Sequence, residues 1–306
     1  MVAVSGLVRW LHAPVPEARA AVFRVLVYLF VPLDVLVLHT SGEYHGHADP
    51  AFYQPLLVGR VLPLPTPTVE LVQLCKWGVV LLACALVVLC VRGRYSRVLG
   101  WTVFALYLEY QVIAFSYGKV DHDRFGYLLA LAVVPTLGAV RLRSATRSEA
   151  AGWTLRMAQL GAVATYFYAA FAKLRFGGLG WVTSGTVARA VIRRGTWVAD
   201  ELLRRAPSLI QASQWGIMAM ELLAPGLFAL SERWRRRVVA GFFVFHLVTY
   251  VSITIAFWPH LLTLLAFLPL ERLVGVTPPP PEPSPLARWL PARLGGRPDR
   301  RPVAVP

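Results

Sequence analysis

Long apolar runs separated by short polar connections dominate this chain. Runs such as 71–90 and 238–257 approach the roughly 20 residues that an α-helix needs to cross a bilayer. They are apolar at most positions rather than at alternate positions, which excludes a transmembrane β-barrel. The pattern predicts membrane spans at about residues 20–38, 69–91, 98–116, 124–140, 153–173, 209–230, 237–257 and 259–271.

The expected fold is therefore all-α, a polytopic membrane helical bundle of about eight spans (seven to nine). We expect an N-terminal segment over residues 1–19, a transmembrane domain over residues 20–274, and a tail over residues 275–306. The tail is rich in proline and arginine and is expected to be disordered. The N-terminal segment lacks a small-residue cleavage site after a short apolar core, so no removable signal peptide is expected.

Composition supports a membrane protein, because 57% of the 306 residues are hydrophobic. The formal net charge of +15 would suggest nucleic acid in a soluble protein, but basic residues here cluster in the short connections 91–98, 141–152 and 231–237. Positive charge in short loops marks the cytoplasmic side and favours anionic headgroups. We therefore expect a multi-pass protein of the cell membrane with both termini in the cytoplasm, and no nucleic-acid partner.

Metal and thiol chemistry are not expected. Cys75, Cys84 and Cys90 fall in or beside one predicted span, and the sequence contains no Cys-x-x-Cys pair. The segment His45-Gly-His-Ala-Asp49 alternates ligand types, but it has no third histidine in register. We predict no metal site.

Lys173 lies near the outer end of a predicted span, seven residues after Tyr166 and on the same helical face. An ammonium in hydrocarbon is costly, so such residues usually line a cavity, although a lysine at a helix end can also snorkel to the interface. Glu109, His122 and His246 fall at outer ends of spans or inside them. One outward-facing polar pocket would explain all five residues. Separate structural contacts between helices are the alternative.

Several segments together resemble the horizontally transferred transmembrane (HTTM) family, whose best-known member is vitamin K-dependent gamma-glutamyl carboxylase. The most specific element is Tyr166-Phe-Tyr-Ala-Ala-Phe-Ala-Lys-Leu174, followed by Trp181 and Gly185. The resemblance covers roughly residues 20–270. Its other elements are Phe23-Arg24 with Asp34, Asp121-His122-Asp123, Phe245-His246-Leu247, Phe257-Trp-Pro259 and Phe267-Leu-Pro269. The family has an Asn-His pair or similar where this chain has Asp121-His122.

The resemblance implies an integral membrane enzyme that uses a reduced naphthoquinone, of the vitamin K or menaquinol type, together with oxygen in an outward-facing pocket. Lys173 would be the base that deprotonates the quinol, and His122 and His246 would donate supporting hydrogen bonds. Tyr166, Trp181 and Glu109 are expected around the cofactor. The expected partners are then the lipid bilayer and a lipid-soluble quinone.

Only a short stretch follows the last predicted span, so we do not expect the large luminal domain with which the carboxylase binds its protein substrate, and carboxylation of a protein glutamate is not carried over. A second hypothesis, from a different class, is a non-catalytic membrane protein for the maturation, export or immunity of a secreted peptide. It would resemble sporulation-delaying protein B and would bind a peptide or a partner membrane protein. A transporter is less favoured, because no inverted internal repeat is visible.

Overall fold

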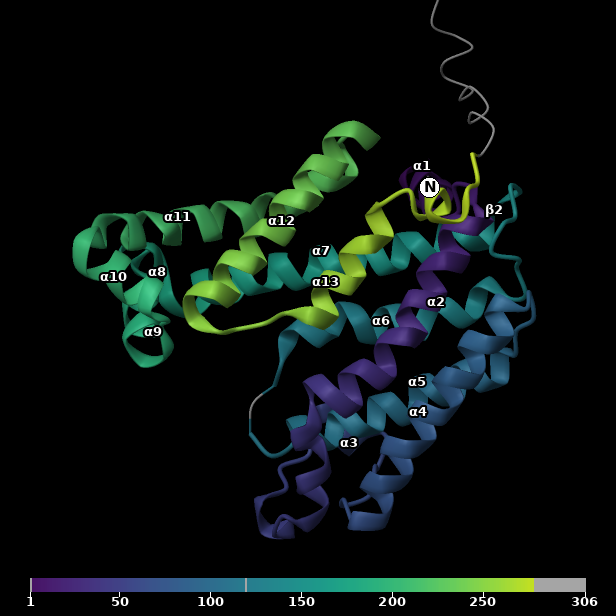
Figure 1. The fold of residues 1–306 in the computed structure, drawn as a ribbon, viewed down its shortest axis with the longest axis horizontal. Helices are drawn as coiled ribbons and strands as arrows, with labels where there is room; N and C mark the ends of the chain where they lie inside the picture. Colours follow the sequence, from purple (N-terminus) through teal and green to yellow (C-terminus); the bar gives the residue numbers. More distant parts are fainter. Residues whose placement is uncertain (1, 119, 278–306) are drawn as a thin grey trace, which may run out of the picture.

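The computed structural model describes residues 2–118 and 120–277, and within them the chain is all-α apart from one two-residue strand pair (Figure 1). The helices are α1 Val2–Leu11, α2 Glu17–Leu33, α3 Leu57–Val61, α4 Val69–Val91, α5 Arg97–Phe115, α6 Phe125–Val133, α7 Glu149–Gly177, α8 Gly180–Thr183, α9 Thr186–Arg194, α10 Trp197–Arg205, α11 Pro207–Leu223, α12 Glu232–Ile253 and α13 Trp258–Leu264. The strands are β1 Val15–Pro16 and β2 Arg147–Ser148, which pair antiparallel.

Side-chain caps explain where three long helices begin. The hydroxyls of Thr68, Ser96 and Ser148 accept hydrogen bonds from backbone N–H groups in the first turns of α4, α5 and α7. Each cap satisfies one of the N–H groups that a helix start leaves without an intrahelical partner. The first of them places the start of α4 at Val69, which is where the apolar pattern predicted it.

Four helical segments of the described chain are long and apolar enough to cross a membrane, which supports a membrane protein but leaves the count of eight unconfirmed. These segments are Glu17–Leu38, Val69–Val91, Arg97–Phe115 and Glu232–Ile253. The first combines α2 with a π-helical turn over Asp34–Leu38.

The other expected spans are shorter or more polar. Helix α6 has nine residues and gives way to a 3₁₀ turn that contains Pro135, which has no N–H to continue the helix. Helix α12 ends at Ile253 because Thr254 adopts a left-handed conformation, with φ at 55°. Pro259 then starts α13 in its first turn, so the eighth expected span is a separate short helix. Residues 174–208, between two of the predicted spans, contain α8, α9 and α10. The expected disordered tail lies largely outside the described residues.

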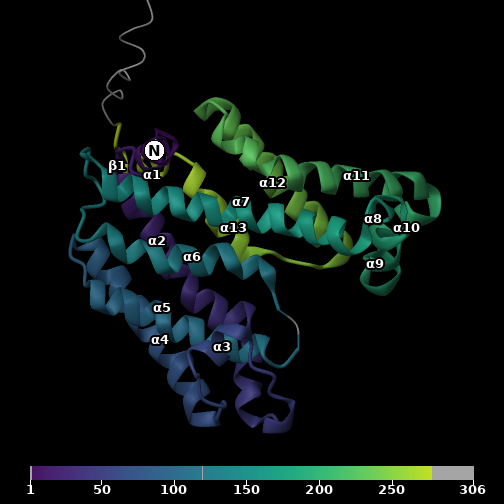
Figure 2. The same cartoon turned by 180° about the vertical axis from the view of Figure 1, so that it is seen from behind.

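Two groups of helices make up the bundle (Figures 1 and 2). Helices α2, α4 and α5 pack around one apolar core with α6 and part of α7, while α12, α13 and another part of α7 share a second core around Tyr166. Helices α6 and α7 approach closely at two glycines. A Cβ atom added to Gly161 would lie 3.2 Å from the Cα atom of Gly126. Small residues of this kind allow helices in a membrane to pack backbone to backbone.

The arginine-rich connections lie along the same side of the bundle as α1, and the α4–α5 connection is the farthest from it (Figure 1). A Cβ atom added to Gly93, in the connection after α4, would lie 3.3 Å from the Arg141 side chain. Arg19, at the start of α2, lies 3.8 Å from Glu232 at the start of α12. The β1–β2 pair joins the residues just before α2 to Arg147–Ser148, so the 141–152 connection also lies beside the start of α2. Helices α8, α9 and α10 occupy a region far from these connections.

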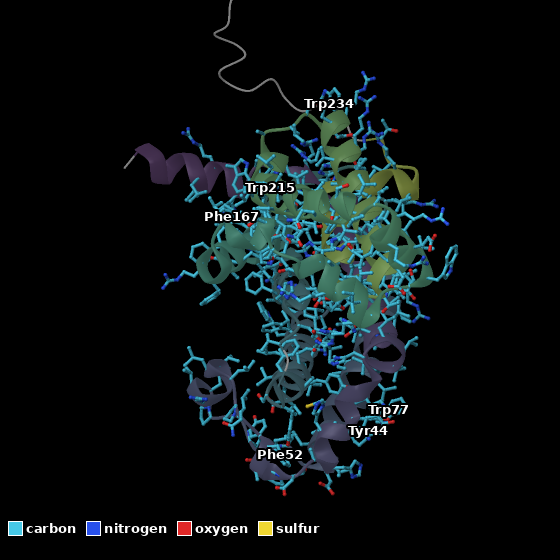
Figure 3. The ribbon with its side chains drawn as sticks, turned by 90° about the vertical axis from the view of Figure 1, so that its left-hand side faces the viewer. Tyr44, Phe52, Trp77, Phe167, Trp215 and Trp234 are labelled. Atoms are coloured by element: carbon cyan, nitrogen blue, oxygen red, sulfur yellow. The ribbon has the colours of Figure 1, made fainter. Side chains whose placement is uncertain are left out.

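Large aromatic side chains project from the surface at both ends (Figure 3). Trp234 lies at the arginine-rich end, whereas Tyr44 and Phe52 lie at the opposite end, and all three are more than half exposed. Tryptophan and tyrosine are enriched where a membrane meets water. The distribution therefore agrees with a protein whose two ends sit at the two interfaces.

Candidate functional site

A cavity of about 630 Å³ lies among α7, α11, α12 and α13, with α8, α9 and α10 closing one side. Most of its wall is apolar, including Val187, Val191 and Leu202 from the helices of the 174–208 segment. Its titratable and aromatic lining residues include His122, Asp123, Tyr166, Lys173, Trp181, Glu221, His246, Phe257 and His260. A cavity with apolar walls and a few polar groups is the usual form of a small-molecule site.

Five of the six residues singled out from the sequence line this one cavity, namely Lys173, His122, His246, Tyr166 and Trp181. Glu109 does not. It lies on α5 and lines a separate groove between α4 and α5, beside Cys75 and Trp101. Its carboxylate oxygens are buried and have no hydrogen-bond partner among the described residues.

Lys173 is ion-paired with Glu221. Its Nζ atom lies 2.7 Å from each carboxylate oxygen of Glu221, and it also donates to the carbonyl oxygen of Ala169 at 3.4 Å. The face of the Trp181 ring lies 5.3 Å from Nζ, within the range of a cation–π interaction. These contacts hold the ammonium in the cavity wall.

Tyr166 and His246 form the second polar contact of the cavity. The Tyr166 hydroxyl lies 2.8 Å from His246 Nε2, at hydrogen-bond distance. The Tyr166 ring stacks on Phe242 at 4.5 Å between centroids and meets the edge of His260 at 4.3 Å. His246 Nδ1 and both His260 ring nitrogens are buried without a hydrogen-bond partner in the described part of the chain. Such orphaned polar atoms are rare in cores and mark places where another group is accommodated.

His122 reaches the cavity from a short 3₁₀ turn, His122–Arg124, that precedes α6. Its ring centroid lies 6.2 Å from that of Phe257, which in turn lies 4.9 Å from His246. Asp123, in the same turn, is 9% exposed. Burial raises the pKa of its carboxyl to about 6, although the positive charge of Arg124 opposes the shift.

A buried ion pair behind the cavity anchors this turn. Arg124 donates to an Asp34 carboxylate oxygen at 2.5 Å, and the Tyr107 hydroxyl donates to the same oxygen at 2.6 Å. Asp34 begins the π-helical turn that continues α2. Inserted π turns often occur at functional sites, where they direct side chains that a regular helix would orient differently. Here the turn places a carboxylate where it can fix the segment that carries His122.

Sequence reasoning missed three residues of the cavity. Glu221 lies inside the predicted span 209–230, but nothing along the chain indicated that it pairs with Lys173. His260 and Asp123 were not assigned a site. The available signal for Glu221 and His260 was an ionisable residue in an otherwise apolar helix, which usually faces the interior of a membrane protein. Among the described residues, no three His, Cys, Asp or Glu side chains are grouped so that they could hold a metal ion.

Comparisons with known proteins gave no match: no family model matches the chain, and neither a curated protein nor a solved structure does. The resemblance to the HTTM family therefore depends on the sequence elements quoted above. The chemistry of the cavity, in contrast, can be argued from its own residues. It combines an ion pair, a tyrosine–histidine contact and two further histidines within apolar walls.

Proposed function

We propose that this protein is an integral membrane enzyme of the HTTM type that uses a lipid-soluble reduced naphthoquinone and oxygen to deprotonate or modify a substrate. The observation that carries the proposal is the Lys173–Glu221 ion pair, at 2.7 Å, in the wall of a largely apolar cavity that also contains the Tyr166–His246 contact. Titratable groups held close together in a largely apolar cavity are typical of acid–base catalytic sites.

The residues present fit a reduced naphthoquinone. The apolar walls suit its rings and isoprenoid tail, and Trp181, Tyr166 and Phe257 offer aromatic faces. The unpartnered nitrogens of His246 and His260 lie in residues that line the same space and suit a ligand that carries hydroxyl or carbonyl oxygens. When bound, such a group supplies the redox chemistry with oxygen that no side chain of this protein can supply.

The side chains would then act by binding, by orientation and by proton handling. Apolar residues of α9 and α10 form part of the cavity wall and lower the local dielectric constant, which strengthens electrostatic interactions beside them. Lys173 and Glu221 provide one positive and one negative group at fixed positions, and His122 and His246 offer hydrogen bonds from two other walls. Preorganised charges of this kind lower the energy of a developing oxyanion.

We also propose an orientation in the membrane. The three arginine-rich connections lie along the same side of the bundle, and short basic connections normally stay in the cytoplasm. Both termini would then be cytoplasmic, and the cavity, beside α8–α10, would face outward. Single cysteines at Tyr95, Ala145 and Trp234 should be inaccessible to an impermeant reagent in intact cells. Labelling of two of them from outside would contradict this orientation.

The enzyme hypothesis can be tested with purified full-length protein. Mass spectrometry of co-purifying lipids should detect a quinone, and the protein should consume its reduced form in the presence of oxygen. A paired substitution, Lys173→Met with Glu221→Gln, removes both charges together and should abolish this consumption. Glu109→Gln, in a glutamate outside the cavity, is the matched control and should retain it.

The same variants separate the enzyme from the non-catalytic alternative. A protein that acts only as a partner in peptide maturation, export or immunity should keep its cellular phenotype when Lys173 and Glu221 are neutralised, provided that the bundle is intact. Loss of the phenotype together with loss of quinol consumption would favour the enzyme. Retention of the phenotype with no consumption by the unsubstituted protein would favour the alternative.

A further inference from the structure

We propose that Glu221 is the group that accepts the proton of the bound substrate, and that Lys173 acts as a fixed ammonium that stabilises the resulting oxyanion. This inference rests on the proposed function. It deepens it by naming a neutral, planar aromatic alcohol as the class of molecule that the cavity ionises. It also assigns Lys173 a role other than that of the base, namely stabilisation of the oxyanion.

The contacts of Lys173 are those of an ammonium with all its hydrogens engaged. An ammonium has three N–H donors and no lone pair. The described residues provide three acceptors, the two Glu221 oxygens at 2.7 Å and the Ala169 carbonyl oxygen at 3.4 Å. The Trp181 face at 5.3 Å adds a further contact that favours positive charge. In this arrangement Lys173 has nothing with which to accept a proton.

Glu221 has the capacity that Lys173 lacks. The two oxygens of an ionised carboxylate offer about four lone-pair positions. In the described part of the chain, Lys173 is the hydrogen-bond donor recorded for both oxygens. The Glu221 side chain is 9% exposed and belongs to the cavity wall, so a ligand in the cavity meets a buried carboxylate with lone pairs to spare.

The charge balance of the step favours the same assignment. The O–H bond of the aromatic alcohol breaks, a new O–H bond forms on Glu221, and the electron pair stays on the alcohol oxygen beside the Lys173 ammonium. Before the step the cavity holds one ammonium and one carboxylate, and after it one ammonium and one aromatic oxyanion. The net charge of the cavity does not change. A transfer that keeps a buried site neutral avoids the desolvation cost of an unpaired ion.

A neutral Lys173 acting beside an ionised Glu221 would lack this advantage, because it would leave the carboxylate buried without a counter-ion. Lys173 and Glu221 could also be present as a neutral amine and a neutral carboxylic acid. The amine would then accept the proton of the alcohol, and the end state would be the same as for transfer to Glu221. The two routes are separated by replacing lysine with arginine. Guanidinium does not lose its proton in proteins, but it pairs with carboxylates through two parallel hydrogen bonds.

The test uses the full-length protein in lipid nanodiscs and 4-nitro-1-naphthol as the probe. The ionised form of this naphthol absorbs at longer wavelength than the neutral form, so its protonation state can be read without turnover. At a pH below the probe's own pKa in water, we expect the protein to bind the probe and ionise it. Infrared difference spectra should show the C=O band of a newly protonated carboxyl group in the same samples.

Lys173→Arg should still ionise the bound probe and still show the carboxyl band. Glu221→Gln should lose the carboxyl band. It leaves the Lys173 ammonium without a carboxylate, so probe that it binds in ionised form releases its proton to the solvent rather than to a side chain. Should Glu221→Gln fail to fold, the charge-neutral pair Lys173→Met with Glu221→Gln should likewise bind the probe without the carboxyl band. Glu109→Gln should behave as the unsubstituted protein does.

Each remaining outcome counts against one statement. If the carboxyl band persists in Glu221→Gln, or in the neutral pair, Glu221 is not the acceptor. If Lys173→Arg alone abolishes ionisation, the lysine amine is the base. Binding without ionisation in the unsubstituted protein refutes this inference but leaves a naphthol site, whereas absence of binding refutes the proposed function itself.

Discussion

Arg124 donates a hydrogen bond of 2.5 Å to Asp34 inside the bundle, 90 residues away in the sequence. The pair joins the end of α2 to the turn that precedes α6, and this turn carries His122 and Asp123 into the cavity wall. Asp34 is fully buried and Arg124 nearly so. The position of one cavity wall therefore depends on a charge pair that does not itself line the cavity.

Removing one partner of this pair should be costly. Asp34→Asn leaves the Arg124 guanidinium buried without a counter-ion, and we expect a loss of about 3–5 kcal/mol of stability. Thermal unfolding in detergent measures the effect. Glu43→Gln is the matched control, because Glu43 pairs with Lys76 at a site where the carboxylate is 30% exposed. That change should cost less than about 1 kcal/mol. Equal losses in the two variants would contradict the argument.

The Lys173–Glu221 pair predicts a related pattern inside the cavity. Lys173→Ala leaves the Glu221 carboxylate without its counter-ion. Because the Glu221 side chain is only 9% exposed, the variant should unfold at a lower temperature. We expect a cost of roughly 3 kcal/mol, most of which should be recovered when Glu221→Gln is added. Independent, additive losses in the double variant would show that the two residues do not interact in the membrane-embedded protein.

The sequence contained much of the information on single helices and little on how they meet. The apolar run predicts a span at about residues 69–91, and α4 extends from Val69 to Val91. The seven-residue spacing predicts that Tyr166 and Lys173 share a face, and both line the cavity. Spacing along one helix cannot say which other helix faces it, so the pairing of Lys173 with Glu221 was not predictable. For the same reason Glu109 was expected near the other polar residues, although α5 presents it to a separate groove.

Proline and amphipathic patterns account for the other differences. The apolar run 124–140 suggested one span, but Pro135 divides it into a short helix and a 3₁₀ turn. No span was predicted over residues 174–208, whereas the structure has helices α9 and α10 there, with apolar residues such as Val191 lining the cavity. A helix of nine residues whose apolar face is narrow is easily read as a polar loop.

Asp123 should make stability depend on pH. Its carboxyl has a pKa of about 6 in the folded protein, above the ordinary 3.8, because it is buried. The folded state therefore holds the proton more tightly than the unfolded chain does. The stabilisation is present at low pH and is lost as the pH rises through about 6. Asp123→Asn should stabilise the protein near neutral pH by roughly 2 kcal/mol and have little effect at about pH 4.

The comparison must be made as a difference between variant and unsubstituted protein. Burial lowers the pKa of His39 to about 4, so acid weakens the fold through that residue while it strengthens it through Asp123. Unfolding temperatures of both proteins over this pH range give the contribution of Asp123 alone. A difference that does not change with pH would show that Asp123 has the same proton affinity in both states.

Tyr166→Phe tests the second polar contact of the cavity. The change removes the hydroxyl that lies 2.8 Å from His246 Nε2 and leaves that nitrogen without this partner. The ring contacts with Phe242 and His260 remain possible, so we expect a loss of only about 1 kcal/mol in stability. Affinity for 4-nitro-1-naphthol should fall by a larger factor than for Phe243→Leu, a change outside the cavity lining. Equal affinity in both variants would remove Tyr166 and His246 from the binding site.

The close approach of α6 and α7 gives the last prediction, in which two identical substitutions should have opposite effects. Alanine in place of glycine normally stabilises a helix by up to about 1 kcal/mol. At Gly241 in α12 an added Cβ atom meets nothing within 4 Å, so Gly241→Ala should raise the unfolding temperature. At Gly161 the same atom would lie 3.0 Å from the Leu129 side chain and 3.2 Å from the Gly126 Cα atom.

Backbone at that distance cannot move aside without separating the two helices. Gly161→Ala should therefore lower stability by about 1–3 kcal/mol despite its better helix propensity. Because α7 carries Tyr166 and Lys173, the variant should also bind 4-nitro-1-naphthol more weakly, whereas Gly241→Ala should bind it normally. If both substitutions raised the unfolding temperature, α6 and α7 would be farther apart than described, and the cavity wall that α7 forms would have to be placed differently.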